Sequence, residues 1–351
     1  MRYSKVRVEA LGYELAPNVV SSLSLEERLA PVYRALALKP GQLEAFTGIR
    51  ERRWWDPGFR LSEGAARAGL KALEASAVKP SDLGLLAYAG VCREGFEPAT
   101  ACAVADRIGV GGAVEVLDVS NACLGVLNGM VLAADRIELG RTRAALVVSC
   151  ESARDIVELA LARMLERPAL EEFSASLATL TGGSGAAAVL LSDGSFGPGG
   201  HRLLGGAVRA APEHHRLCRW GVEPAPDAVP AHAQMREVMV TDPVAVLKNG
   251  VALGRQTWND LLRELAWTPE GVDRVVCHQV GKAHQDEILK ALGIPPEKDF
   301  TTFEHLGNIG TVSLPLTLAL AAERGHVEPG HKAALLGIGS GLNCLMLGLE
   351  W

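Results

Sequence analysis

The sequence predicts an α/β fold built from two similar halves. Short apolar runs alternate with segments of helical period, which is typical of sheets that helices cover on both faces. Three pairs of segments also resemble one another in the same order, and the members of each pair are separated by nearly the same length of chain. The paired segments begin at Lys79 and Thr268, at Asp106 and Lys290, and at Gly140 and Gly330. We interpret this regularity as an internal duplication.

Five short runs of apolar residues predict buried strands. They cover Leu83–Val91, Ala144–Ser149, Ala186–Leu191, Arg274–Cys277 and Ala333–Ile338.

Four segments with apolar residues three or four positions apart predict helices. They cover Ser62–Val78, Leu124–Leu139, His284–Leu292 and Ser313–Glu323. We expect Ser62 to cap the first helix, and Gly140 and Gly293 to end the second and third. Pro315 fits the fourth helix only within its first turn.

The duplication suggests a first half over residues 1–191 and a second half over 236–351. The stretch 192–235 is rich in Gly, Pro and His, which predicts a connecting or covering region.

Composition excludes several classes of protein. A hydrophobic fraction of 48% and a charged fraction of 22% over 351 residues are globular values. The net charge of −6 and the lack of a Lys/Arg block disfavour nucleic-acid binding. Charged residues interrupt the N-terminal segment, so we expect no secretory signal, and the longest uncharged run holds four glycines, which disfavours a membrane span. Seven cysteines without a CxxC pair predict a reduced, cytoplasmic protein.

Cys123 is the first candidate catalytic residue. It lies in DVSNACLG, between a strand-like run and an apolar helix. We expect the positive end of that helix to favour the thiolate and lower the thiol pKa. A buried cysteine that only packs remains the alternative.

His278 and Asn308 are the second and third candidates. His278 follows the predicted strand Arg274–Cys277, where it can act as a base, donate to an oxyanion, or serve structure alone. Asn308, between Gly307 and Gly310, can donate to an oxyanion or shape a turn. Because Asn308 follows Cys123 by nearly the interval that separates the paired segments, the duplication puts both at equivalent corners. A Cys/His/Asn set matches thiolate acyl transfer.

Six segments in order resemble the thiolase superfamily, in its 3-oxoacyl-acyl-carrier-protein synthase III branch. They are TGIRERR, DVSNAC, TGGSGAAAVLL, HQV, GNIGTVSLP and ALLGIGSGLN. The resemblance implies a thiolase fold of five layers, αβαβα, and a homodimer. It implies an acyl group on Cys123, a substrate oxygen held by His278 and Asn308, and an oxyanion site formed by the backbone N–H groups of Cys123 and Ser340.

Further segments, among them NACLGVLNGM and REGFEPATA, resemble the acyl-CoA condensing enzymes of bacterial olefin biosynthesis, OleA. Glu97, upstream of Cys123, looks like the glutamate that those enzymes donate across the dimer interface. A second acyl-CoA keeps its α-proton until a base removes it, and a Glu97 with raised pKa in an apolar channel suits that task. The alternative is a surface-loop glutamate before Pro98.

The same resemblance suggests substrate contacts at Phe46, Thr47, Trp54 and Gly339, although Trp54 fits the core equally well. The family pattern is not kept at Phe46, Ser184 and Gly281, where Arg, Asp and Asn are usual. We expect no metal, because His214, His215 and Cys218 lack a suitably spaced fourth ligand. We expect His284 to be solvated or a cap.

Together these features predict an enzyme that loads an acyl group from acyl-CoA on Cys123 and condenses it with a second long-chain acyl-CoA. CoA enters as part of the substrate, and no separate cofactor is expected. Two alternatives remain: decarboxylative condensation with a malonyl-carrier protein, and acyl transfer to another nucleophile.

Overall fold

The computed structural model describes residues 1–224 and 235–351, so part of the predicted connecting region, residues 225–234, lies outside the description. The chain forms a mixed α/β fold around a nine-stranded sheet in the order β11-β12-β13-β8-β1-β7-β6-β4-β5. The elements of the first half are β1 (Arg7–Leu15), α4 (Leu61–Glu74), β4 (Leu83–Tyr88), α5 (Thr100–Ile108), β5 (Glu115–Asp118), α6 (Gly125–Glu138), β6 (Ala144–Glu151) and β7 (Gly185–Ser192). Those of the second half are β8 (His201–Ala210), α9 (Pro243–Leu265), β11 (Arg274–Cys277), α10 (Lys282–Leu292), α12 (Ser313–Glu323), β12 (Lys332–Gly339) and β13 (Asn343–Glu350).

Further elements surround this frame. They are β2 (Asn18–Ser21), α1 (Ser22–Arg28), α2 (Ala30–Ala35), α3 (Gln42–Thr47), β3 (Glu51–Trp54), α7 (Arg154–Glu166), α8 (Leu170–Ser176), β9 (Cys218–Pro224), β10 (Met235–Thr241) and α11 (Phe303–Leu306).

The predicted duplication is confirmed by the strand topology. In the first half β4 pairs in parallel with β5 and β6, and β6, β7 and β1 continue antiparallel. In the second half β11 pairs in parallel with β12, and β12, β13 and β8 continue antiparallel. One parallel bridge, Val275 to Asp299, stands where the first half has β5. The halves join along β1 and β8 through only two paired positions.

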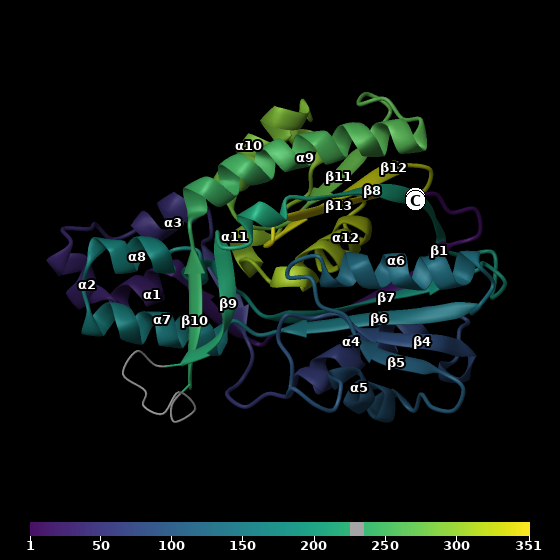
Figure 1. The fold of residues 1–351 in the computed structure, drawn as a ribbon, viewed down its shortest axis with the longest axis horizontal. Coiled ribbons are helices and arrows are strands. Elements are labelled where there is room, and N and C mark those ends of the chain that lie inside the picture. The colour runs from purple at the N-terminus through teal and green to yellow at the C-terminus, as the bar shows by residue number, and fades with distance from the viewer. Residues whose placement is uncertain (225–234) are drawn as a thin grey trace.

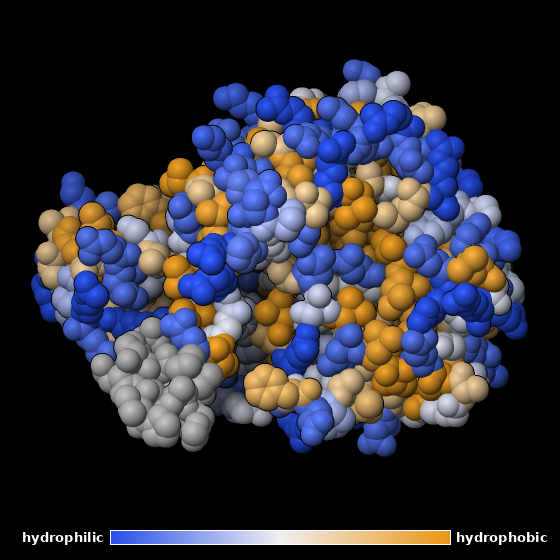
Figure 2. Space-filling model, viewed as in Figure 1, coloured by the Kyte–Doolittle hydropathy of each residue, from blue (hydrophilic) through white to orange (hydrophobic). Residues whose placement is uncertain are grey.

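Five layers result, as Figure 1 shows from bottom to top. We call the part of the sheet with β5, β4, β6, β7 and β1 the first sheet, and the part with β8, β13, β12 and β11 the second sheet. Helices α4 and α5 cover the outer face of the first sheet, α6 and α12 lie between the two sheets, and α9 and α10 cover the second sheet. The outer surface of α9 is mainly polar (Figure 2). No helix in residues 1–224 or 235–351 combines the length and the apolar character that a membrane crossing requires.

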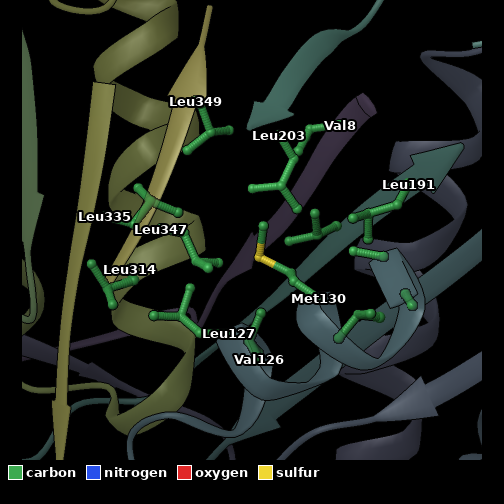
Figure 3. Packing of buried hydrophobic residues seen from close by; sticks show 14 of the residues in the cluster. Val8, Val126, Leu127, Met130, Leu191, Leu203, Leu314, Leu335, Leu347 and Leu349 are labelled. Atoms are coloured by element: carbon green, nitrogen blue, oxygen red, sulfur yellow. The ribbon is translucent and has the colours of Figure 1, made fainter. Parts of the chain in front are cut away.

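The middle layer holds the core that fixes the site. Met130 of α6 is 2% exposed and lies among leucines of α12, β8 and the second sheet (Figure 3). Glycines let the layers approach, since a Cβ on Gly337 would lie 2.6 Å from Leu127. Burial of each large apolar side chain in this layer contributes about 1.5–3 kcal/mol to the free energy of folding. The α6 and α12 helices, which begin beside Cys123 and Asn308, are thereby held together.

Most predicted elements are confirmed to within a few residues, and the range of α12 matches with Pro315 in its first turn. Three details were wrong: the end of α4, its cap and the end of β4. Helix α4 ends at Glu74 because Ser76 bonds the carbonyl of Leu73 and the N–H of Val78, which turns the chain. Ser62 is not the cap: Arg60 holds that position, and the carboxylate of Glu94 accepts the Ser62 N–H. Strand β4 ends at Tyr88 rather than Val91.

The stretch 192–235 is more than a connection, because it contains β8, a strand inside the sheet. Its Gly205 and Gly206 resemble loop residues in the sequence. A Cβ at either would collide with a backbone oxygen, so close strand packing requires glycine there. The hairpin of β9 and β10 covers the cavity described below.

Candidate active site

A cavity of about 1600 Å³ opens between the first-half corner at Cys123 and the second half. Cys123, His278, Asn308, Gly339 and Ser340 all line it. Each comes from the end of a strand or the start of a helix, where parallel strands release side chains into a shared crevice. The structure therefore brings these predicted residues together.

Cys123 lies just before α6, after Ala122 in the left-handed region at φ 46°. Thr311, from the loop that carries Asn308, accepts the N–H of Val126 at 2.7 Å. One hydroxyl thus satisfies an end of α6 and links the two equivalent corners.

The expected effect on the Cys123 thiol was wrong in sign. Burial, with negative charge at Cys218 and Glu151, raises the pKa of Cys123 to about 12. Desolvation disfavours the thiolate more than the helix end favours it. The side chain is only half-buried, because it faces the cavity rather than packed atoms. Cys123 is therefore a thiol at neutral pH, and it needs a base when it attacks.

His278 can be that base. Its backbone N–H pairs with Leu336 of β12 at 3.0 Å, which extends β11 into the cavity. Burial, and the neighbouring His284, lower the pKa of His278 to about 4, so its ring is neutral at pH 7. Its Nδ1 is buried and has no hydrogen-bond partner in the part of the chain that the structure describes.

The side chain of Asn308 is oriented by its own loop. Its Oδ1 accepts the N–H of Gly310 at 3.0 Å, while its backbone pairs with Thr181 and Gly183 at 2.9 Å. Since Oδ1 is used, the Nδ2 group is the part left to donate into the cavity. Gly307 has φ 68°, and a Cβ there would lie 2.5 Å from the carbonyl oxygen of Thr181, so glycine is required beside Asn308.

A ladder of side-chain amides joins the Ser340 loop to the cysteine corner. Asn343 donates to Asn121 at 3.0 Å, and Asn121 donates to Asn128 of α6 at 2.8 Å. A Cβ on Gly339 would lie 3.4 Å from the backbone nitrogen of Cys123. The backbone segments that carry the two expected oxyanion donors are thus held beside each other. The sequence interpretation missed this ladder, because amide pairs between halves leave no spacing signal.

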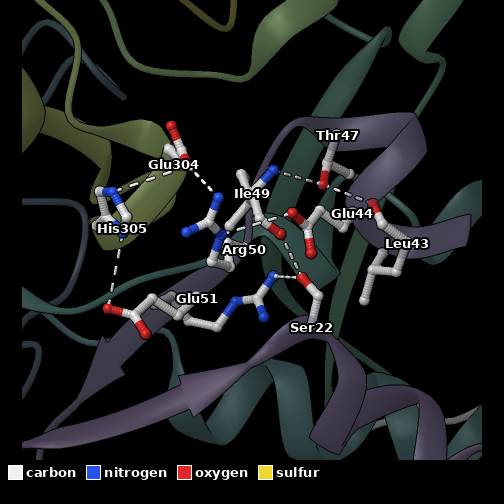
Figure 4. A network of polar contacts seen from close by, with 10 residues as sticks. Ser22, Leu43, Glu44, Thr47, Ile49, Arg50, Glu51, Glu304 and His305 are labelled. Atoms are coloured by element: carbon white, nitrogen blue, oxygen red, sulfur yellow. Dashed lines mark hydrogen bonds and ion pairs between the residues drawn. The ribbon is translucent and has the colours of Figure 1, made fainter. Parts of the chain in front are cut away.

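The predicted substrate contacts divide into two groups. Phe46, 48% exposed, and Thr47 lie in or just before the end of α3 and line the cavity. Thr47 itself donates to the carbonyl of Leu43 at 2.6 Å and accepts from Ile49. Figure 4 shows the network of the neighbouring TGIRER segment, in which Arg50 bridges to Glu304 at 2.9 Å. Arg50 also pairs with Glu44 of α3, so this segment ties α3 to α11.

Trp54 belongs to the other group. It is 3% exposed, packs in a hydrophobic cluster and donates from Nε1 to the Gly182 carbonyl at 3.2 Å. It does not line the cavity. Its assignment as a substrate contact was wrong, and the core interpretation holds.

Glu151 and His284 also line the cavity, although the sequence did not suggest a functional role for either. Glu151, at the end of β6, is 4% exposed, and its pKa is raised by burial. His284 lines the cavity, and burial lowers its pKa, which contradicts a solvated role. Neither lies in a recognisable motif. No cluster of three or more His, Cys, Asp or Glu able to hold a metal occurs in residues 1–224 and 235–351.

Glu97 does not line the cavity of its own chain. It lies in the exposed loop between β4 and α5, beside Phe96, which is 102% exposed.

Comparisons with known proteins give a consistent picture. The 3-oxoacyl-[acyl-carrier-protein] synthase III model matches residues 117–211, and its C-terminal companion matches 262–351. The acyl-CoA:acyl-CoA alkyltransferase of Shewanella oneidensis is 51% identical over 354 residues, which cover 100% of both chains. The acyl-CoA:acyl-CoA alkyltransferase of Xanthomonas campestris is 37% identical, and the match again covers 100% of both chains.

Crystal structures of Xanthomonas campestris OleA superpose closely. The cerulenin-bound form has a TM-score of 0.93 at 37% identity and covers 100% of this chain and 98% of its own. A cysteine-to-serine variant with bound lauric acid and lauroyl-CoA has a TM-score of 0.91 and covers 99% and 100%. Other structures carry substitutions at a cysteine, a glutamate or a histidine. The substituted glutamate and cysteine have the same separation along their chain as Glu97 and Cys123 have in this one.

Proposed function

Because the chain belongs to the 3-oxoacyl-acyl-carrier-protein synthase III family, and within it to the acyl-CoA:acyl-CoA alkyltransferases, we propose that it condenses two long-chain acyl-CoA molecules without decarboxylation. The observation that carries this proposal is the Cys123, His278 and Asn308 set in one large cavity. At about 1600 Å³ it exceeds the 300–1,000 Å³ typical of a site for one small ligand. Two acyl chains therefore have room.

In the first step the Cys123 sulfur attacks the thioester carbonyl of one acyl-CoA. Neutral His278 takes the thiol proton and returns it to the departing CoA sulfur. The backbone N–H groups of Cys123 and Ser340 are the proposed donors to the oxyanion that forms. The products are free CoA and an acyl group on Cys123.

In the second step Glu97 of the partner subunit removes an α-proton from the second acyl-CoA. His278 and the Asn308 amide hold the thioester oxygen on which negative charge develops. The α-carbon forms a bond to the acyl carbon on Cys123, and the Cys123–acyl bond breaks. The Cys123 sulfur regains a proton, and Glu97 loses the one that it removed, so that both groups return to their starting state. A β-keto thioester leaves. CoA is thus the carrier of both substrates, and we propose no resident cofactor.

This chemistry requires a homodimer, and two features of the chain support one. Strand β5 is an edge strand that pairs, among residues 1–224 and 235–351, with β4 alone, so its other side is open to a second copy. The loop with Phe96 and Glu97 projects from the same region, since Asp118 at the end of β5 accepts the N–H groups of Thr100 and Ala101. The unpaired state of all seven cysteines fits the cytoplasm, which we propose as the compartment.

The test is to supply purified protein with lauroyl-CoA alone and to measure released CoA and the carbon products. We expect CoA release and a β-keto product of doubled chain length. Release only with malonyl-carrier protein would favour the decarboxylative reaction, and laurate as the sole product would indicate hydrolysis; either contradicts the proposal.

Replacement of Glu97 separates the two steps. Glu97→Ala should still acylate Cys123, which mass spectrometry detects, while condensation falls by about 100-fold or more. Glu270→Ala, at an exposed loop position, is the control. Normal condensation by Glu97→Ala removes Glu97 from the mechanism.

A further inference from the structure

The loop that carries Glu97 is fixed at its root by a buried carboxylate. Glu151 accepts the Val91 N–H through Oε1 at 2.8 Å and the Cys92 N–H through Oε2 at 3.0 Å. It is 4% exposed, and a buried carboxylate is tolerated only with such partners. Each oxygen of Glu151 therefore binds one backbone N–H group of this loop.

Two further contacts hold the loop before its tip. The Tyr88 hydroxyl lies 2.7 Å from the Cys92 carbonyl and 2.8 Å from that of Cys150. The Glu94 carboxylate pairs with Arg60 at 2.7 Å. The loop is thus anchored from residue 88 to 94 and projects from 95 to 98; we call residues 91–98 the arm.

Glu151 also touches the site of its own chain. A Cβ on Gly310 would lie 3.5 Å from the Glu151 carboxyl carbon, and Gly310 donates to Asn308. Glu151 lines the same cavity as Cys123. It can therefore act on its own site through Asn308, or on the other subunit through the arm. Two of its backbone hydrogen bonds go to the arm, from Val91 and Cys92, and one, from Thr311, goes to the loop that carries Asn308.

We propose that Glu151 is a positioning residue that aims the arm, so that it supports catalysis in the partner subunit's site rather than in its own. This proposal rests on the proposed function, because the arm matters only if Glu97 acts across the dimer. Glu151→Gln keeps the shape of the side chain. It turns an amide NH₂ toward one backbone N–H, which exchanges a hydrogen bond for a repulsion.

Hybrid dimers separate the two routes. Subunits with different affinity tags are co-expressed, and the mixed dimer is isolated. The reference is a dimer of one Cys123→Ala subunit and one unmodified subunit. In the first hybrid, one subunit carries Cys123→Ala and the other carries Glu151→Gln. The one remaining Cys123 then lies in the Glu151→Gln subunit and receives the arm of the Cys123→Ala subunit, in which Glu151 is intact. We expect condensation within about two-fold of the reference.

In the second hybrid, one chain carries Cys123→Ala and Glu151→Gln together, and the other is unmodified. The one remaining Cys123 lies in the unmodified subunit and receives the arm of the other subunit, in which Glu151 is replaced. We expect condensation from lauroyl-CoA to fall at least ten-fold, with acylation of Cys123 unchanged. Loss in the first hybrid alone places the effect in the same chain, and equal loss in both indicates a general defect; either result overturns the proposal.

Parallel hybrids with Glu97→Ala in place of Glu151→Gln test the premise. If these show no difference between the two arrangements, Glu97 does not act across the dimer, and both proposals fall. If they differ as expected while the Glu151 hybrids do not, the Glu151 proposal alone is overturned.

Two more variants guard against a folding artefact. Glu138→Gln alters a carboxylate that likewise accepts two successive backbone N–H groups, from Ser4 at 3.0 Å and Lys5 at 3.1 Å, far from the cavity. We expect it to leave activity unchanged. Tyr88→Phe removes the second anchor of the arm and can be tested even if Glu151→Gln folds poorly. We expect condensation to fall again only when the substitution is in the Cys123→Ala subunit, and by less than with Glu151→Gln.

Discussion

The side-chain amide of Asn343 donates to the Asn121 oxygen at 3.0 Å and so ties the Ser340 loop to the corner that carries Cys123. Asn343 belongs to the second half and Asn121 to the first. The bond holds the segments with the two proposed oxyanion donors, the backbone N–H groups of Cys123 and Ser340, in one geometry.

Removal of this link should slow acylation. Asn343→Ala is expected to lower the rate of Cys123 acylation by about ten-fold, equivalent to about 1.4 kcal/mol, because the oxyanion donors lose their alignment. Rapid-quench mass spectrometry with lauroyl-CoA measures that rate. Asn249→Ala, on α9, removes another side-chain amide bond and should have little effect. An unchanged acylation rate in Asn343→Ala would show that the ladder is not needed for alignment.

The pH dependence of thiol reactivity follows from the pKa of Cys123, which burial raises to about 12. The thiolate fraction then increases about ten-fold per pH unit between pH 7 and 10. Alkylation of Cys123 by iodoacetamide should increase in the same proportion without a plateau, whereas glutathione levels off near its own pKa. A plateau below pH 8 would contradict the desolvated thiol.

The acid limb of catalysis is set by His278, whose pKa burial lowers to about 4. The neutral ring is the active base, and protonation removes it as the pH falls through 4. The value of kcat/KM should therefore stay level between pH 8 and 5 and decrease only below about 5. A midpoint near 6.5, the ordinary histidine value, would argue against this site environment.

Dimerisation should depend on Phe96. Its side chain is 102% exposed, so Phe96→Ala removes no contact within the chain and should leave the melting temperature of the isolated subunit unchanged. Burial of each Phe in a partner is worth about 1.5–3 kcal/mol, and the symmetric dimer has two. We expect the dimer Kd to rise at least 100-fold by analytical ultracentrifugation. Leu139→Ala, 68% exposed elsewhere, is the matched control; equal Kd values would place Phe96 outside the interface.

The middle layer should be sensitive to cavities. Met130→Ala is expected to lower the free energy of unfolding by about 2–5 kcal/mol, because the side chain is 2% exposed between the two sheets. Urea denaturation measures the change. Leu170→Ala, 62% exposed, should change it by less than about 0.5 kcal/mol. Similar values for both variants would contradict the packing of α6.

The sequence was enough to predict the α/β class, the duplication, most strands and helices, and the places of Cys123, His278 and Asn308. These features are local or periodic: apolar runs, glycines after helices, and motifs at strand ends. It missed β8, because Gly205 and Gly206 resemble a loop when the backbone atoms that crowd them are unknown.

The chemistry of the site depends instead on how distant segments pack. The helix end next to Cys123 is visible in the sequence, but the burial that raises the pKa of its thiol is not. Trp54 could be assigned to the core only from its surroundings. Glu151 and the Asn343–Asn121 pair carry no motif, since hydrogen bonds between distant segments depend on how the layers meet. Local pattern therefore places the reactive groups, and packing sets their ionisation and alignment.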